Sequence, residues 1–228
     1  MELERLQERL GYHFSEPDLL VRALTHRSAS GPNNERLEFL GDSVLNFVVA
    51  AEVFGRREQA REGELSRLRA NLVNQASLAE IGRELGLGDV VRLGGGEMKA
   101  GGQRRDSILS DTLEAIVGAI YLDAGFEACR EILRRLYGNR LRDLPSVGEL
   151  KDPKTRLQEH LQSIRLPLPD YRVLEVAGRA HAQTFRVECR ITGLVPVTSG
   201  TANSRRQAEQ KAAASMLQRL EAEVDPLE

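Results

Sequence analysis

The stretch Asn34-Glu-Arg-Leu-Glu-Phe-Leu-Gly-Asp-Ser43 decides how this chain is interpreted. On a helix, Glu35, Glu38 and Asp42 are spaced at i, i+3 and i+7, so three carboxylates project from one face while apolar residues form another. Like charges at this spacing repel one another. The stretch therefore predicts an amphipathic helix that carries a candidate acidic site.

A second acidic pair stands in the most apolar part of the sequence. Asp111 and Glu114 are about one helical turn apart and precede the run Ala115-Ile-Val-Gly-Ala-Ile-Tyr-Leu122. Carboxylates in such surroundings are costly to bury unless they are paired or bind a metal. If the two helices pack, with Gly41 and Gly118 permitting a close approach, their acids would form an oxygen-lined site suited to Mg²⁺ or Mn²⁺.

The alternative for each acid is a solvated helix face, with Arg36 or Arg105 as a salt-bridge partner. This alternative suits Glu35 best, and it suits Asp111 and Glu114 least because their neighbours are apolar.

Composition places the chain among soluble globular proteins. Hydrophobic residues make up 41% of the 228 residues and charged residues 29%, and no apolar run approaches the length of about 18 residues needed to cross a bilayer. The first residues are charged and lack the apolar core of a secretory signal, so we expect a cytoplasmic protein without a membrane segment. Cys129 and Cys189 lie far apart without metal-ligand spacing, and we interpret both as core residues.

The hydrophobic periodicity changes along the chain. Residues 1–140 show Leu and Ala at three- and four-residue spacings, which predicts an all-α half, with a glycine-rich surface loop over Leu93–Gln103. Further along, Asp152 and Pro153 favour a helix start, and Ser204 with Gln207 favours another. Three strands are predicted between these helices, over Tyr171–Val176, Phe185–Ile191 and Leu194–Thr198, the last at a sheet edge because it contains Pro196.

Charge divides in the same place. Residues 151–219 hold 12 Lys and Arg against 6 Asp and Glu, whereas residues 1–150 hold 20 against 24. A basic module joined to an acidic one suggests that the first binds a polyanion and that the second needs carboxylates.

The acidic stretches resemble bacterial ribonuclease III. Asn34–Asp42 is similar to the signature of that family, and Ser110–Asp123 is similar to its second active-site helix. The resemblance covers essentially the whole chain. It implies metal-binding carboxylates at Glu38, Asp42, Asp111 and Glu114, with Asp42 and Glu114 as catalytic residues. It also implies, less directly, that Glu35 and Glu62 handle the RNA near the cut.

The same resemblance implies the domains and the reaction. We expect an all-α nuclease domain over residues 1–143, a linker over 144–150, an α-β-β-β-α double-stranded-RNA-binding domain over 151–221 and an acidic tail over 222–228. The implied enzyme is an endoribonuclease that hydrolyses double-stranded RNA with Mg²⁺, for which Mn²⁺ substitutes. Its products carry 5′-phosphate and 3′-hydroxyl ends with short 3′ overhangs. The implied partner is a second copy, with the interface near Phe39, and the implied targets are ribosomal RNA precursors and messenger RNA.

Two divalent cations about 4 Å apart can supply the chemistry of phosphodiester hydrolysis, so no side-chain base is obligatory. We therefore expect a structural role for His26.

Three regions of the C-terminal half resemble the RNA-contacting regions of the binding domain. Polar side chains there suit the 2′-hydroxyls of the minor groove, and a basic helix N-terminus suits the phosphates. The candidate RNA-binding residues are Thr155, Gln158, His181, Ser204, Arg205, Arg206 and Lys211. Arg205 and Arg206 stand where the family often has lysines, which preserves charge, and Ala202 stands where a glycine is common.

Two other functions are weighed against the nuclease. The presence of all the matching acids argues against a non-catalytic RNA-binding or chaperone protein that retains the nuclease fold. A metal phosphatase or deoxyribonuclease would have no use for the C-terminal module.

Overall fold

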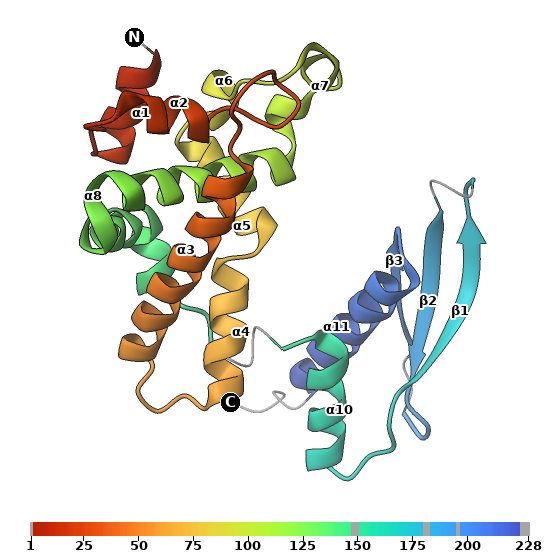
Figure 1. The fold of residues 1–228 in the computed structure, drawn as a ribbon. Coiled ribbons are helices and arrows are strands. Elements are labelled where there is room, and N and C mark those ends of the chain that lie inside the picture. Colours follow the sequence, from red (N-terminus) through yellow and green to blue (C-terminus); the bar gives the residue numbers. More distant parts are fainter. Residues whose placement is uncertain (1, 147–150, 180–182, 195–196, 224–228) are drawn as a thin grey trace. The chain divides into compact units, whose positions relative to one another are not determined.

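The chain forms two compact units, residues 1–147 and 148–228. The structure, a computed structural model, describes residues 2–146, 151–179, 183–194 and 197–223 (Figure 1). Leu144, placed in the linker by the sequence prediction, is 9% exposed, and its carbonyl oxygen accepts a hydrogen bond from Arg57 Nη2 at 2.6 Å. This part of the segment is therefore attached to the N-terminal unit.

The N-terminal unit is helical, which confirms the predicted all-α class. Its elements are α1 (Glu2–Leu10), α2 (Pro17–Ala23), α3 (Glu35–Arg56), α4 (Glu62–Leu72), α5 (Gln75–Glu84), α6 (Leu87–Val90), α7 (Gly95–Lys99), the 3-10 helix η1 (Gly102–Arg104) and α8 (Asp106–Arg142). Within α8 the backbone leaves helical geometry at Gly125 and Gly138, where φ is 79° and 36°. Glycine tolerates such positive φ values, so the helix changes direction at these points.

The core of this unit lies where α3 crosses α8 (Figure 1). A side chain at Gly41 would place its Cβ 1.7 Å from the carbonyl oxygen of Glu114, and one at Gly118 would lie 2.2 Å from the carbonyl oxygen of Leu37. Since no side chain fits at either position, the two helices touch backbone to backbone. This confirms the close approach expected from Gly41 and Gly118.

The surface loop predicted over Leu93–Gln103 is exposed or half-buried along most of its length, but most of it is helical, because α7 and η1 form there. Gly101, with φ of 77°, lies between them. The segment is attached to the turn before α3: the amide of His26 donates to the carbonyl oxygen of Arg92 at 3.0 Å, and the amide of Gly94 donates to Ser28 Oγ at 2.9 Å. The glycines thus permit tight local turns that a reading of glycine as a loop former overlooks.

The C-terminal unit is a three-stranded antiparallel sheet with two helices. Its elements are α10 (Pro153–Ser163), β1 (Asp170–Ala177), β2 (Thr184–Arg190), β3 (Thr198–Ala202) and α11 (Arg205–Glu223), and the strand order is β1-β2-β3. Asp152 caps α10 by accepting from the amide of Lys154 at 2.9 Å. The core contains an apolar stripe of α11, formed by Ala208, Ala212, Met216 and Leu220.

The third strand begins four residues later than predicted. The expected strand was Leu194–Thr198, but the structure has Thr198–Ala202; Pro196 lies outside the described residues. A side chain at Gly200 would lie 2.3 Å from the carbonyl oxygen of Ala208. Because α11 rests directly on this strand, small residues are needed there, and the apolar alternation used for prediction is absent.

Cys129 and Cys189 are buried free thiols, as predicted. Among the described residues, no helix is long and apolar enough to cross a membrane.

Candidate active site

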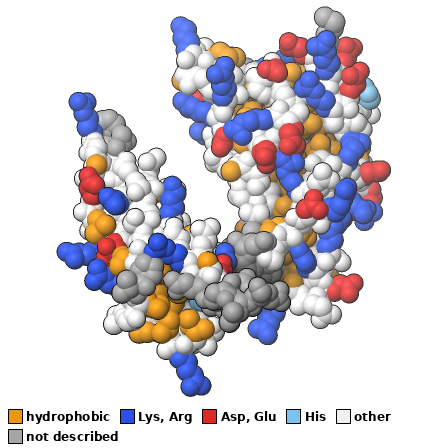
Figure 2. All heavy atoms as spheres, turned by 180° about the vertical axis from the view of Figure 1, so that it is seen from behind, with side chains coloured by type: hydrophobic (Ala, Val, Ile, Leu, Met, Phe, Trp, Pro, Cys, Tyr) orange, Lys and Arg blue, Asp and Glu red, His pale blue; other side chains and the backbone are white. Residues whose placement is uncertain are grey.

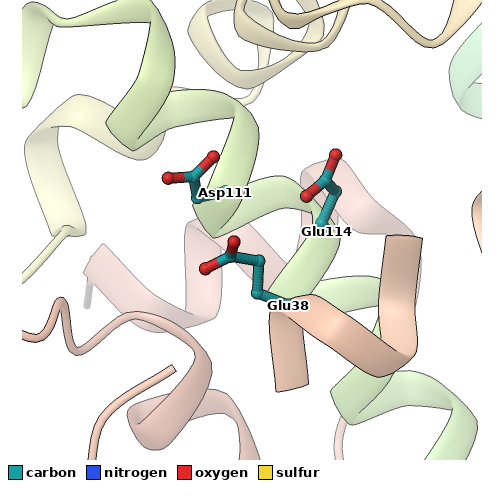
Figure 3. A group of neighbouring side chains, drawn as sticks. All are labelled: Glu38, Asp111 and Glu114. Carbon is teal, nitrogen blue, oxygen red and sulfur yellow. The ribbon is translucent and has the colours of Figure 1, made fainter. Parts of the chain in front are cut away.

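Three carboxylates meet where α3 contacts α8. Glu38 comes from α3, and Asp111 and Glu114 come from successive turns of α8 (Figure 3). Each offers one oxygen, and these oxygens all lie within 4.8 Å of one another. The backbone contact at Gly41 holds the two helices close enough for acids of both to share one site.

Burial and mutual repulsion disfavour the charged forms of these acids. Burial, followed by repulsion from Asp42, Asp111 and Glu38, raises the pKa of Glu114 to about 8. Burial also raises the pKa of Asp111, and burial with the nearby Asp111 charge raises that of Glu38. A divalent cation would relieve both costs, and carboxylate oxygens are the hard ligands that Mg²⁺ and Mn²⁺ prefer. The residues present therefore fit such an ion.

Asp42 lies at the edge of this group. Its carboxylate is close enough to raise the pKa values of Glu114 and Glu38. It is exposed, and its Oδ1 accepts a hydrogen bond from Asn46 Nδ2 at 2.7 Å. The three-oxygen group does not include it. The structure thus brings together three of the four predicted metal carboxylates and places the fourth beside them.

A cavity of about 450 Å³ opens next to Glu38 and Asp111. All of its lining residues except Ile108 have polar or charged side chains, and they are His26, Arg27, Ser28, Asn34, Glu35, Glu38, Glu97, Arg105, Ser107, Ile108 and Asp111. Glu35 therefore shares the site, and its Oε1 lies 3.6 Å from Arg27 Nη1. Arg105, considered above as a partner for the acids, pairs instead with Glu97, Nη1 to Oε1 at 2.6 Å.

His26 makes local contacts in the wall of this cavity. Its Nδ1 accepts from the amide of Ser28 at 3.1 Å and lies 2.8 Å from Ser28 Oγ. The same hydroxyl oxygen accepts a hydrogen bond from the Gly94 amide, so the imidazole helps to hold the wall of the cavity in place.

Glu62 occupies a different environment within the chain. It begins α4, accepts from Ser66 Oγ at 2.8 Å, and lines a mostly apolar cavity of about 380 Å³ with Phe47 and Phe54.

A row of phenylalanines follows one side of α3. Phe39, Phe47 and Phe54 are 78%, 62% and 69% exposed. At 100° per residue their side chains point within about 80° of one another. Tyr121 and Leu122 of α8 are also exposed. An apolar row of this kind on the surface is typical of an interaction site.

The C-terminal unit presents most of the predicted RNA-binding residues. Thr155, Gln158, Arg206 and Lys211 are exposed, whereas His181 lies outside the described residues. Ser204 Oγ accepts from the amide of Gln207 at 3.3 Å, which agrees with the helix start expected at these two residues. On the face of the smaller unit drawn in Figure 2, basic side chains predominate, while on the larger unit the two signs are interspersed.

Sequence reasoning missed the partners of these cations. Glu209 is 8% exposed and accepts from Arg205 Nε at 2.9 Å and from Lys154 Nζ at 2.5 Å. The charge of Arg205 is thus partly neutralised within the unit.

Sequence reasoning also missed Asn34 and Glu97 in the cavity wall of the N-terminal unit, since an isolated Asn or Glu gives no distinctive spacing signal.

Comparison with known proteins agrees with this architecture. The family described as Ribonuclease-III-like matches residues 16–141, and the Double-stranded RNA binding motif matches residues 153–220. Ribonuclease 3 of Alkalilimnicola ehrlichii is 63% identical over 218 residues, which cover 96% of each chain. Ribonuclease 3 of Hahella chejuensis is 61% identical over 95% of this chain and 96% of the relative.

The same similarity appears among solved structures. The nuclease domain of ribonuclease III from Campylobacter jejuni aligns with a TM-score of 0.59 and 48% identity, covering 60% of this chain and 96% of that one. With both halves matched in order and curated relatives matched over nearly their full length, the chain belongs to the ribonuclease III family.

Proposed function

We propose that this protein is an endoribonuclease that hydrolyses phosphodiester bonds in double-stranded RNA by a divalent-metal mechanism. One observation carries the proposal: carboxylates of two helices in backbone contact gather into an oxygen-lined site, in a chain that also carries a double-stranded RNA binding motif. The family membership and the Ribonuclease 3 relatives support it.

Glu38, Asp111 and Glu114 would hold the ion, with Asp42 beside them, and Mg²⁺ is the ion we propose, with Mn²⁺ as a substitute. When bound, divalent cations stabilise the charge that grows on phosphoryl oxygens and on a leaving oxygen. The chain contributes the arrangement of the carboxylates, and Glu35, which lines the polar cavity beside them, would contact the RNA strand near the cut.

The proposed reaction is the hydrolysis of one phosphodiester bond by water. The oxygen of a water forms a bond to phosphorus, the bond from phosphorus to the 3′ oxygen breaks, and a proton passes to that oxygen. The products would carry 5′-phosphate and 3′-hydroxyl ends. Asp42 and Glu114 are the residues to which we assign the catalytic role.

We propose that a homodimer of the nuclease domains cuts both strands and leaves short 3′ overhangs. One active site cuts only one strand, so cutting both strands requires two nuclease domains. The exposed row of Phe39, Phe47 and Phe54 is the surface through which we expect the two domains to associate. In the C. jejuni nuclease domain, a structurally flexible region is involved in dimer formation. Sedimentation velocity should show a dimer that Phe39→Glu dissociates and that Met98→Glu, a control at an exposed apolar residue of α7, leaves intact. A native monomer would contradict this part of the proposal.

The C-terminal unit would bind duplex RNA by shape and charge through the residues named above. Ribosomal RNA precursors and messenger RNA are the proposed targets, and the cytoplasm is the proposed location. Glu62 would act near the cut only if it belongs to a composite site in the dimer, because it lines another cavity in its own chain.

The deciding experiment is cleavage of a long perfect RNA duplex with and without Mg²⁺. Glu114→Gln removes one ligand charge with little change in shape, and Glu131→Gln makes the same change at an exposed position of α8. We expect native protein and Glu131→Gln to cut only with Mg²⁺, and Glu114→Gln to bind duplex without cutting. If native protein binds duplex but does not cut it in Mg²⁺ or Mn²⁺, the chain is a binding protein and the proposed activity is wrong. Cutting of duplex DNA at a similar rate would favour a general nuclease.

A further inference from the structure

The cavity beside the carboxylates contains cationic and amide groups that the proposed reaction does not use. Arg27, Asn34 and Arg105 line it together with Glu38 and Asp111. They come from the turn before α3 and from the residue that precedes α8. Ile108 is the one apolar residue in a lining otherwise made of charged and polar groups, so the cavity suits a charged ligand.

Asn34 supplies an independent sign of a ligand. The residue is 2% exposed, and its Nδ2 has no hydrogen-bond partner among the described residues. It does not cap α3 either, since no side-chain cap bond forms at this position. A buried N–H donor without an acceptor is unfavourable, which favours an oxygen acceptor at this wall of the cavity.

The two arginines are paired by charge but retain donors. Arg105 lies 2.6 Å from Glu97 Oε1, yet that oxygen accepts no hydrogen bond, so the ion pair is misaligned. Arg27 and Glu35 are 3.6 Å apart, which is an ion pair without a hydrogen bond. Guanidinium groups present up to five N–H donors each, and phosphate oxygens are well suited to them.

The acids of the cavity are accounted for separately. Glu35 and Glu97 face the arginines, and Glu38 and Asp111 belong to the proposed metal site. Asn34 Nδ2 is therefore the donor without any partner, whereas Glu97 Oε1, which accepts no hydrogen bond, is still compensated by the charge of Arg105.

We propose that this cavity is a phosphate subsite that holds a backbone phosphate of the RNA strand next to the one that is cut, with Asn34, Arg27 and Arg105 as its donors. This inference rests on the proposed function, because it takes the neighbouring carboxylates to hold the scissile phosphate through a cation. The subsite fixes the strand one nucleotide from the cut and thus orients the scissile bond.

The test measures how tightly two small probes bind to the full chain in Mg²⁺, by isothermal titration calorimetry. Adenosine 3′,5′-bisphosphate carries two phosphates separated by one ribose, and adenosine 5′-monophosphate carries only one. Neither contains a phosphodiester bond, so binding is measured without cleavage. We expect the bisphosphate to bind more tightly, because its second phosphate reaches the subsite.

Two substitutions with opposite expected effects identify the donors. Arg105→Gln should weaken bisphosphate binding about five- to tenfold and leave the monophosphate unchanged. Glu97→Gln should strengthen bisphosphate binding, because it removes a competing anion from Arg105. If the ion pair only held the segment in place, both variants would weaken binding. Arg104→Gln is the matched control, since Arg104 is exposed and lies outside this cavity.

The outcomes separate the two proposals. If native protein cuts duplex RNA but binds both probes equally, or if Arg105→Gln and Arg104→Gln behave alike, the subsite is overturned and the nuclease stands. If native protein does not cut RNA but the bisphosphate still binds in an Arg105-dependent manner, the anion subsite stands and the proposed function fails.

Discussion

Replacing Gly41 by alanine tests whether the backbone contact between α3 and α8 builds the site. The added Cβ would lie 1.7 Å from the carbonyl oxygen of Glu114 and 2.7 Å from the amide nitrogen of Gly118. Real Cβ atoms essentially never approach within 3.0 Å of such atoms, so the helices must separate by at least about 1.3 Å. Both obstacles are backbone atoms, which cannot rotate away.

The free energy of unfolding should fall by about 2 kcal/mol. Overpacking typically costs about 1–3 kcal/mol, and the rigid neighbours place this site at the upper end. Alanine returns about 1 kcal/mol through its higher helix propensity. For a chain of this size, the melting temperature of the N-terminal unit should fall by about 4–8 °C. Because Mg²⁺ requires ligand distances near about 2.1 Å, the separation should also reduce cleavage about a hundredfold or more.

Gly55→Ala is the control, because Gly55 lies on the same helix with nothing within 4 Å of its added Cβ. It should leave stability equal or slightly higher and cleavage unchanged. Thermal unfolding by circular dichroism and single-turnover cleavage would measure both variants. If Gly41→Ala melts within about 1 °C of the native protein and cuts RNA at the native rate, the backbone contact does not build the site.

Three further predictions concern other parts of the chain. In metal-free protein Glu114 should be protonated between its ordinary pKa of 4.5 and its raised pKa of about 8. Mg²⁺ must displace that proton, so the Mg²⁺-induced rise in melting temperature should be larger near pH 8.5 than near pH 6.5, and a rise independent of pH would contradict this. Lys211→Gln should weaken duplex-RNA binding and reduce by about 1 the steepness with which the logarithm of the binding constant falls with the logarithm of the salt concentration. Fluorescence anisotropy at several salt concentrations would measure both quantities, and Arg219→Gln should change both less. Asp123→Ala should lower the free energy of unfolding by about 1–2 kcal/mol in urea titration, because Asp123 accepts from the Tyr12 hydroxyl and from two backbone amides; an unchanged midpoint would exclude this role.

The acidic site could be predicted because its signals are local. Glu38 stands on one helix and Asp111 with Glu114 on another, and each spacing fixes which acids share a face. The glycine in each stretch indicated that the two helices could approach closely. The sequence does not determine whether the two acidic faces meet. In the structure they do, because one oxygen from each of the three acids lies within 4.8 Å of the others.

The features that could not be predicted depend on contacts distant in sequence. β3 consists of small and polar residues because α11 lies on Gly200, and no window around Thr198–Ala202 contains that information. The cavity wall at Asn34 and Arg105 likewise combines a turn before α3 with a residue about seventy positions later. Asp42 had the right spacing, but its contact with Asn46 on the same helix turns it to the edge of the group.

The backbone contact between α3 and α8 brings the carboxylates together, and without metal their mutual repulsion should destabilise the folded protein. Glu114→Gln separates this repulsion from the stabilisation by a bound cation. At a pH above about 8, the native protein holds the charges of Glu38, Asp111 and Glu114 at close range in a partly buried position. The neutral amide of Gln removes one of those charges, so in a chelator the variant should be more stable than native protein by at least about 1 kcal/mol.

In Mg²⁺ the order should reverse, because the native site gains binding energy that the variant has lost. The sign of the folding linkage agrees: a carboxyl whose pKa is raised on folding contributes stability below its ordinary pKa and loses that contribution as pH rises through the folded value. Melting temperatures of both proteins, with chelator and with Mg²⁺, would decide the matter. A variant that is less stable than native protein in both conditions would mean that Glu114 stabilises the fold by itself, and that its burial is not explained by a cation.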